Sequence, residues 1–176
     1  MPLSSLRRWL GVAEDEPAEP SALRDLMNSL DALEPEQGRQ VARFAYLLGR
    51  VALADRQVSD EETRAMERLV AEQSGVTPAQ ATVVVGLAKN SNRLFGGTAD
   101  FEVARDFSVA ASYDEKLALA SCLFTVAGED RSISLQEESE IHRILNQLKI
   151  LPQDLRTLRS RHARLLPGLS PAPPAD

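Results

Sequence analysis

Residues 53–62 read Leu53-Ala54-Asp55-Arg56-Gln57-Val58-Ser59-Asp60-Glu61-Glu62, and their pattern returns at residues 128–137 as Gly128-Glu129-Asp130-Arg131-Ser132-Ile133-Ser134-Leu135-Gln136-Glu137. Each copy carries an Asp, a Ser and a Glu at fixed spacing, and the flanking apolar residues of the two copies also match 75 positions apart. These apolar residues recur three and four positions apart, which is the period of an amphipathic helix. The chain therefore contains a duplicated helix-loop-helix unit.

The Ser and the Glu of each copy fit the capping box that begins a helix. Ser59 precedes Glu62 by three positions, and Ser134 precedes Glu137 in the same way. Loss of one such cap typically costs about 0.5–2 kcal/mol, so helix initiation alone accounts for these residues. We expect Asp55, at the end of the preceding apolar stripe, to point toward the packed side and to accept from backbone N–H groups of the next helix.

Apolar periodicity and helix-start signals predict helices through most of the chain. We expect them near residues 21–32, 36–55, 60–74, 78–90, 100–110, 113–128, 135–148 and 153–165. A loop is predicted at residues 90–97, between the two halves. The helix at 113–128 is apolar nearly all round, so we place it at the centre of a bundle and pair it with helix 36–55. The predicted fold is all-α, a single-domain bundle of about seven or eight helices built from two related helix-loop-helix units.

Composition divides the chain into four segments. Residues 1–10 are predicted to form a short amphipathic helix, and residues 11–20 an acidic linker that contains proline. Residues 21–166 are predicted to form the helical domain, and residues 167–176 a disordered Pro-rich tail. The first helix spans about two turns and is marginal in isolation. It needs a surface, which is the chain's own domain, a partner protein or an anionic membrane.

Charge is distributed unevenly along the chain. The formal net charge is −6, which argues against sequence-independent binding of nucleic acid by the whole surface. The last predicted helix is nevertheless basic. Its cations are Arg156, Arg159, Arg161, His162 and Arg164. They either complement the carbonyl end of that helix or dock an acidic partner.

The sequence offers little that is typical of an enzyme or of a secreted protein. It contains no Gly-rich phosphate loop, no G-x-S-x-G elbow and no H-E-x-x-H motif. The single cysteine, Cys122, lies in an apolar helical stretch and is interpreted as a core residue. No apolar run reaches 18 residues. We expect no secretory signal, because the N-terminus lacks the longer apolar core and the cleavage site of one. We expect a cytoplasmic, non-enzymatic protein, with peripheral contact to the inner membrane through residues 1–10 as a further option.

In the two repeated stretches the chain resembles the TerB-like family, named after a tellurite-resistance protein, and especially its small stand-alone bacterial members. The family motif is roughly apolar-Ala-Asp-Gly-x-apolar-Ser-x-x-Glu and occurs in two helical pairs. The resemblance spans about residues 25–165 and includes Thr77-Pro78 and Leu151-Pro152. The usual Gly is Arg56 in one copy and Arg131 in the other. Because a left-handed turn is costly for Arg, we expect these loops to be shaped differently.

The resemblance implies an all-helical domain without established catalytic chemistry, associated with tellurite or other stress resistance and with membrane-linked stress complexes. The predicted function is therefore an interaction or scaffold module, acting near the membrane, that binds a protein partner. The residues chosen for partner binding are Leu6, Trp9, Leu10, Arg156, Arg159, Arg161 and Arg164. The alternative is a divalent-cation site, for which the resemblance supplies Asp55, Glu62, Asp130 and Glu137. No other cofactor is expected.

Overall fold

The computed structural model describes residues 28, 30–95 and 97–167. All regular structure in this part of the chain is helical, which confirms the all-α prediction. The helices are α3 (Pro35–Ala52), α4 (Asp60–Ser74), α5 (Pro78–Phe95), α6 (Thr98–Ala110), α7 (Tyr113–Ala127), α8 (Leu135–Gln147) and α9 (Pro152–Arg161). Among these residues, no helix is long and apolar enough to cross a membrane.

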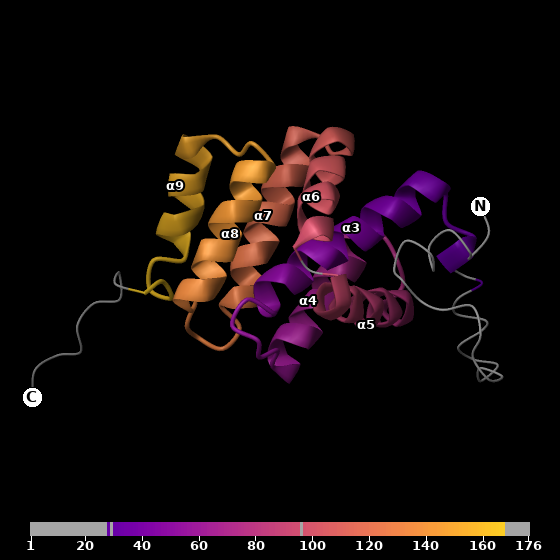
Figure 1. Ribbon diagram of the computed structural model, residues 1–176, viewed down its shortest axis with the longest axis horizontal. Helices are drawn as coiled ribbons and strands as arrows, with labels where there is room; N and C mark the ends of the chain where they lie inside the picture. Colours follow the sequence, from indigo (N-terminus) through magenta and orange to yellow (C-terminus); the bar gives the residue numbers. More distant parts are fainter. Residues whose placement is uncertain (1–27, 29, 96, 168–176) are drawn as a thin grey trace, which may run out of the picture.

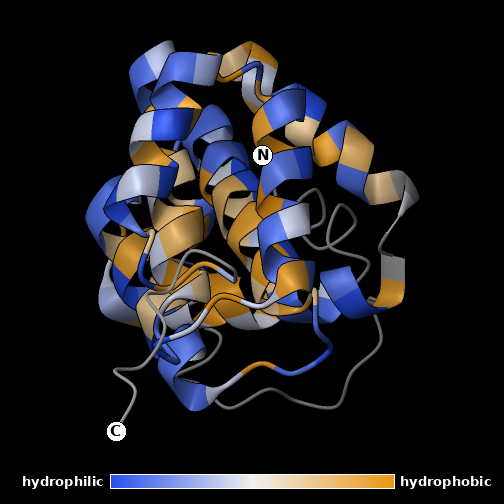
Figure 2. Ribbon diagram, turned by 90° about the vertical axis from the view of Figure 1, so that its left-hand side faces the viewer, coloured by the Kyte–Doolittle hydropathy of each residue, from blue (hydrophilic) through white to orange (hydrophobic). Residues whose placement is uncertain are grey.

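Helix α3 organises the packing of the bundle. It contacts α4, α5, α6, α7 and α8, and it is buried almost continuously from Val41 to Ala52. In Figure 1, α4 and α5 lie on one side of α3, whereas α7 and α8 lie on the other and α9 forms the outer edge. The helices turn apolar faces toward one another and polar faces outward (Figure 2). This is the arrangement expected of amphipathic helices that share one core.

Helix α7 occupies the position in the second half that α3 occupies in the first. It is buried almost continuously from Leu119 to Ala127 and contacts α3, as its apolar composition predicts. Its exposed first turn begins after Ser112, whose side chain forms a capping box with Glu115. The core that α3 and α7 share is mostly aliphatic, with Tyr46, Phe44 and Phe124 as larger members; their exposed fractions are 2%, 6% and 0%.

The prediction of a loop at residues 90–97 was wrong for residues 90–95, because α5 continues to Phe95. The side chain of Asn92 ties this part of α5 to α3. Its Nδ2 donates to the carbonyl oxygen of Tyr46 on α3 and to that of Ala88 on α5, each at 3.0 Å. The close approach requires Gly49 on α3, where an added Cβ would lie 2.7 Å from the Asn92 Nδ2. Polar residues that favour a loop in isolation are therefore kept helical by tertiary contacts.

Two other predicted helices end earlier than expected. Helix α3 ends at Ala52, so Asp55 lies in the following loop and not in the helix. Helix α9 ends at Arg161, and the chain then turns back toward the bundle. The carbonyl oxygen of Leu165 accepts from the N–H of Ile133 at 2.8 Å, and Leu166 is fully buried. This return requires irregular backbone, which a continuing helix could not supply.

Several predictions concern residues outside the described part of the chain. These are the amphipathic helix 1–10 with Leu6, Trp9 and Leu10, the linker 11–20, most of the helix 21–32 and the tail from residue 168 onward. The described end of the 21–32 segment includes Leu30, which is 5% exposed and belongs to the core.

Candidate functional site

The two repeated loops have the same backbone, and both contain a left-handed residue. Arg56 has φ 69° and Arg131 has φ 63°. The N–H of Arg56 donates to the Leu53 carbonyl and that of Arg131 to the Gly128 carbonyl, each at 3.0 Å. The expectation of a different loop shape was therefore wrong, because the turn after each helix needs a left-handed residue at this position whatever its side chain. Each Arg carries a strain of about 1–2 kcal/mol there.

Both loops end in the predicted capping boxes. Ser59 Oγ accepts from the N–H of Glu62 at 3.0 Å, and Glu62 Oε2 accepts from the N–H of Ser59 at 2.8 Å. The second copy repeats this between Ser134 and Glu137, at 3.2 and 2.7 Å. Both glutamates are buried, with exposed fractions of 4% and 5%. The capping interpretation of the Ser and Glu residues is confirmed.

The structure brings the two loops together, which sequence alone did not predict. Ser59 Oγ donates to Asp130 Oδ1 of the other copy at 3.1 Å. Between the loops lies a pocket of about 220 Å³, and all four acidic motif residues line it: Asp55, Glu62, Asp130 and Glu137. The two aspartates lie in the loops that follow α3 and α7, and the two glutamates lie in the first turns of α4 and α8. The repeat thus forms one polar pocket at the junction of its copies.

Burial makes the two glutamates in this pocket weak acids. It raises the pKa of Glu62 to about 7, against the lowering effect of its hydrogen bonds with Ser59, and the charges of Glu137 and Asp130 add to the rise. Burial also raises the pKa of Glu137, against the lowering effect of its hydrogen bonds with Ser134. At neutral pH the pocket therefore holds a proton for part of the time.

The acidic residues share a pocket without forming a ligand set for a metal. Asp55 Oδ1 accepts from the N–H of Gln57 at 2.9 Å, within its own loop. Asp55 is also exposed, so the expectation that it points toward the packed side was wrong. Asp130 and both glutamates each have an oxygen in a hydrogen bond. No group of three or more His, Cys, Asp or Glu residues in the described chain is placed to hold a metal ion.

The basic residues chosen for partner binding lie along α9 and just after it. Leu158 anchors this helix in the core, and Arg159 forms an ion pair with Glu138 of α8 at 2.7 Å. Arg156, Arg161 and Arg164 are exposed. Arg159 therefore helps to attach α9 to α8, whereas the exposed arginines make the outer face of α9 positive.

A buried polar network, missed in the sequence, ties the two halves together. Arg50 of α3 donates from Nε to Glu140 of α8 at 2.9 Å and from an Nη to the Asp100 carbonyl at 3.0 Å. Tyr46 donates to the Asp100 side chain at 2.8 Å, and Arg143 donates to Glu140 at 2.7 Å. The sequence signal that could have indicated this network is that Arg50 and Glu140 have no matching residues 75 positions away in the other copy. Thr125 and Ala65 occupy the equivalent positions of Arg50 and Glu140.

The single cysteine belongs to the core, as predicted. Cys122 is 4% exposed, and burial together with the charge of Glu72 raises the pKa of its thiol to about 11. A thiol with such a pKa is almost fully protonated at neutral pH, so it is a poor nucleophile.

Comparison with known proteins adds one finding. The family model described as tellurite resistance protein TerB matches residues 42–160. This match includes both repeated loops, the pocket between them and nearly all of the helices from α3 to α9. No curated protein and no solved structure matches the chain. Because the family model covers well over half of the sequence, the chain belongs to the TerB family.

Proposed function

We propose that this TerB-family chain is a non-enzymatic interaction module that binds an acidic protein partner through the outer face of α9. The observation that carries the proposal is the placement of this helix. It forms the edge of the bundle in Figure 1, and it exposes Arg156 and Arg161 while Leu158 holds its inner face in the core. A rigid helix with exposed arginines supports the capture of carboxylate groups, to which guanidinium groups bind in a bidentate manner.

The biological setting follows from family membership and remains part of the proposal. The module acts in the cytoplasm, near the inner membrane, in resistance to tellurite or a related stress. Loss of the gene should then lower survival on tellurite. The wild-type gene should restore survival, and a gene with a charge-reversed α9 should not.

A matched pair of charge reversals tests the partner-binding surface. Arg156→Glu with Arg161→Glu reverses two exposed cations of α9, whereas Arg64→Glu with Arg93→Glu reverses two exposed cations on α4 and α5. The two double variants change the net charge by the same amount, because each replaces two arginines with two glutamates. After cross-linking in the native cell, the α9 pair should lose the partners that the wild type retains, and the control pair should keep them. Equal retention by both pairs would exclude α9 as the binding surface.

A divalent-cation site in the pocket between the loops is the second candidate. It is supported by the four carboxyl groups that line one pocket of about 220 Å³. Their oxygens would have to leave hydrogen bonds within the loops in order to converge on an ion, because hard cations require several oxygens at about 2.0–2.6 Å. Protonation of Glu62 would compete with the ion, so binding should strengthen between pH 6 and pH 8.

Calorimetric titration with calcium, magnesium and zinc separates the two candidates. A cation site predicts heat and a higher melting temperature with at least one metal, and both effects should disappear in Glu62→Gln with Glu137→Gln. If millimolar metal gives neither heat nor a change in melting temperature, the cation site is excluded. The α9 proposal does not depend on that result.

A further inference from the structure

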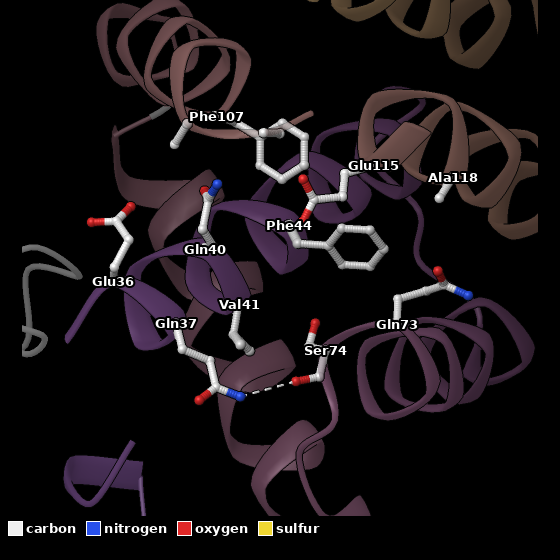
Figure 3. A pocket seen from close by; sticks show the side chains of 12 residues that line it. Glu36, Gln37, Gln40, Val41, Phe44, Gln73, Ser74, Phe107, Glu115 and Ala118 are labelled. Carbon is white, nitrogen blue, oxygen red and sulfur yellow. Dashed lines mark hydrogen bonds between the residues drawn. The ribbon is translucent and has the colours of Figure 1, made fainter. Parts of the chain in front are cut away.

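A groove at the beginning of α3 lies at the other end of that helix from the pocket between the loops. It has a volume of about 350 Å³ and is formed by the beginning of α3, the ends of α4 and α6, and the first turns of α7 (Figure 3). Val41, Phe44 and Phe107 form its apolar floor, and the two aromatic rings lie 6.5 Å apart at a tilt of 46°. An apolar floor of this kind fits the apolar side of a short helix.

The charged residues that line the groove favour a ligand that carries cations. The charged residues that line it are Glu36 and Glu115, and both are acidic. Glu36 is paired with Arg39 and Arg43, whereas hydrogen bonds from Ser112 lower the pKa of Glu115 and keep it ionised at neutral pH. A suitable ligand is therefore apolar on one side with cations beside that side. The carboxylate of Glu115 would face those cations.

The chain itself contains a segment with this chemistry. Residues 3–10 place Leu3, Leu6, Trp9 and Leu10 on one side of a helix, with Arg7 and Arg8 beside them. They lie outside the described residues, and twenty positions separate Leu10 from Leu30, which is buried in the core six positions before Glu36. Twenty residues reach up to about 60–70 Å when extended, so the connection permits docking in the groove.

We propose that residues 3–10 dock as an amphipathic helix in this groove of their own chain. Trp9 and the leucines then rest on Val41, Phe44 and Phe107, and the arginines face Glu115. A short connection gives the segment an effective concentration on the order of millimolar, so even a weak intramolecular contact is populated. The groove also supplies the surface that a helix of about two turns needs in order to form.

Trp9 makes this proposal directly measurable, because it is the only tryptophan in the chain. In the full-length protein its emission should be shifted to shorter wavelength, and its quenching by acrylamide should be several-fold weaker than in a peptide of residues 1–12. Equal quenching of the protein and the peptide would overturn the proposal.

Two neighbouring substitutions show whether it is this groove that protects Trp9 from quenching. Ala110→Arg places a bulky cation in the groove, whereas Val109→Arg places the same side chain at the adjacent position, which is 83% exposed and does not line the groove. Both changes lie in the last turn of α6, where a cation is favourable, so both variants should fold, as far-UV circular dichroism will show. Ala110→Arg should raise Trp9 quenching to the level of the peptide, and Val109→Arg should leave it unchanged. Identical quenching in the two variants would overturn the groove assignment.

A change in the segment itself gives a test that does not touch the folded domain. Arg7→Glu with Arg8→Glu should also expose Trp9, because the groove carries acidic residues. Two outcomes would identify a different occupant and overturn docking within one chain. One is protection of Trp9 that grows with protein concentration and accompanies a dimer in sedimentation. The other is protection that appears only with vesicles containing phosphatidylserine. None of these measurements involves α9, so their failure would leave the proposed partner surface standing.

Discussion

The loop at residues 53–59 and the loop at residues 128–134 share their turn and capping hydrogen bonds but differ in what covers them. Both contain a left-handed Arg and end in a Ser-Glu capping box. In the second loop Ile133 is 3% exposed and donates its N–H to Leu165, whereas Val58, its equivalent in the first loop, is half-buried. The comparison teaches that the duplicated sequence determines the local backbone, while the segment after α9 makes the two copies unequal.

The helices of the two copies differ in a second way. The Arg50–Glu140 pair joins α3 of the first copy to α8 of the second, and its side chains are 2% and 11% exposed. Thr125 and Ala65 at the equivalent positions cannot form such a pair. The buried contact between the halves therefore depends on residues at which the repeat is broken.

The largest expected effect is the loss of this contact between the halves. Arg50→Met leaves Glu140 buried with Arg143 as its remaining cation, and it should lower the free energy of unfolding by about 3–5 kcal/mol. Urea denaturation measures the loss. Arg68→Met is the control, because the Arg68–Glu129 pair has an arginine that is 52% exposed, and it should cost about 0–1 kcal/mol. Equal losses would show that the buried pair does not hold the halves together.

The unequal covering of the loops predicts unequal sensitivity to truncation. Ile133→Ala should lower the free energy of unfolding by about 2–4 kcal/mol, because it opens a cavity beneath the segment after α9. Val58→Ala at the half-buried position should cost roughly 1 kcal/mol. The two variants can be compared by urea denaturation under the same conditions. Similar losses would contradict the idea that this segment distinguishes the two copies.

Stability should depend on pH through the glutamates in the pocket between the loops. The pKa of Glu62 is about 7 in the folded chain, against an ordinary value of 4.5. Between these values the folded chain binds more protons than the unfolded chain. The contribution of Glu62 to stability is therefore fully present below about pH 4.5 and is lost as pH rises to about 7, which lowers the free energy of unfolding by about 1–3 kcal/mol.

Glu62→Gln removes this titration and keeps a cap acceptor. Its melting temperature should match the wild type near pH 4.5 and exceed it at pH 8. Glu137→Gln should act in the same direction, because burial raises the pKa of that residue too. Thermal melts over this pH range provide the measurement. Parallel profiles for wild type and Glu62→Gln would show that the carboxyl group does not titrate in this window.

The smallest effect should be the same in both copies. Arg56→Gly and Arg131→Gly each remove the backbone strain of a left-handed residue that carries a Cβ. Each should raise the free energy of unfolding by about 0.5–1 kcal/mol, which is the strain minus the cost of the greater backbone entropy of unfolded Gly. Arg64→Gly, inside α4, should instead cost about 1 kcal/mol. A loss at all three positions would contradict the strain that we assign to the loops.

The extent to which the candidate site could be predicted differs between its parts. The capping role of Ser59 and Glu62 followed from their spacing, because a cap involves residues three positions apart. The shape of the loop at Arg56 was predicted wrongly, because the preference of one residue is small beside the need of the whole turn for a left-handed position. The meeting of Ser59 with Asp130 joins residues 71 positions apart, and no local pattern indicates it.

The sequence by itself determined the helical class, the duplication, the starts of α4, α7 and α8, and the family of this chain. These features depend on periodicity and on contacts within a single helical turn. Only the tertiary structure decided that the two loops enclose one pocket, that Glu62 becomes a weak acid there, that α5 extends to Phe95 and that Arg50 meets Glu140. Each of these depends on burial or on contacts between distant segments, which arise only when the helices pack.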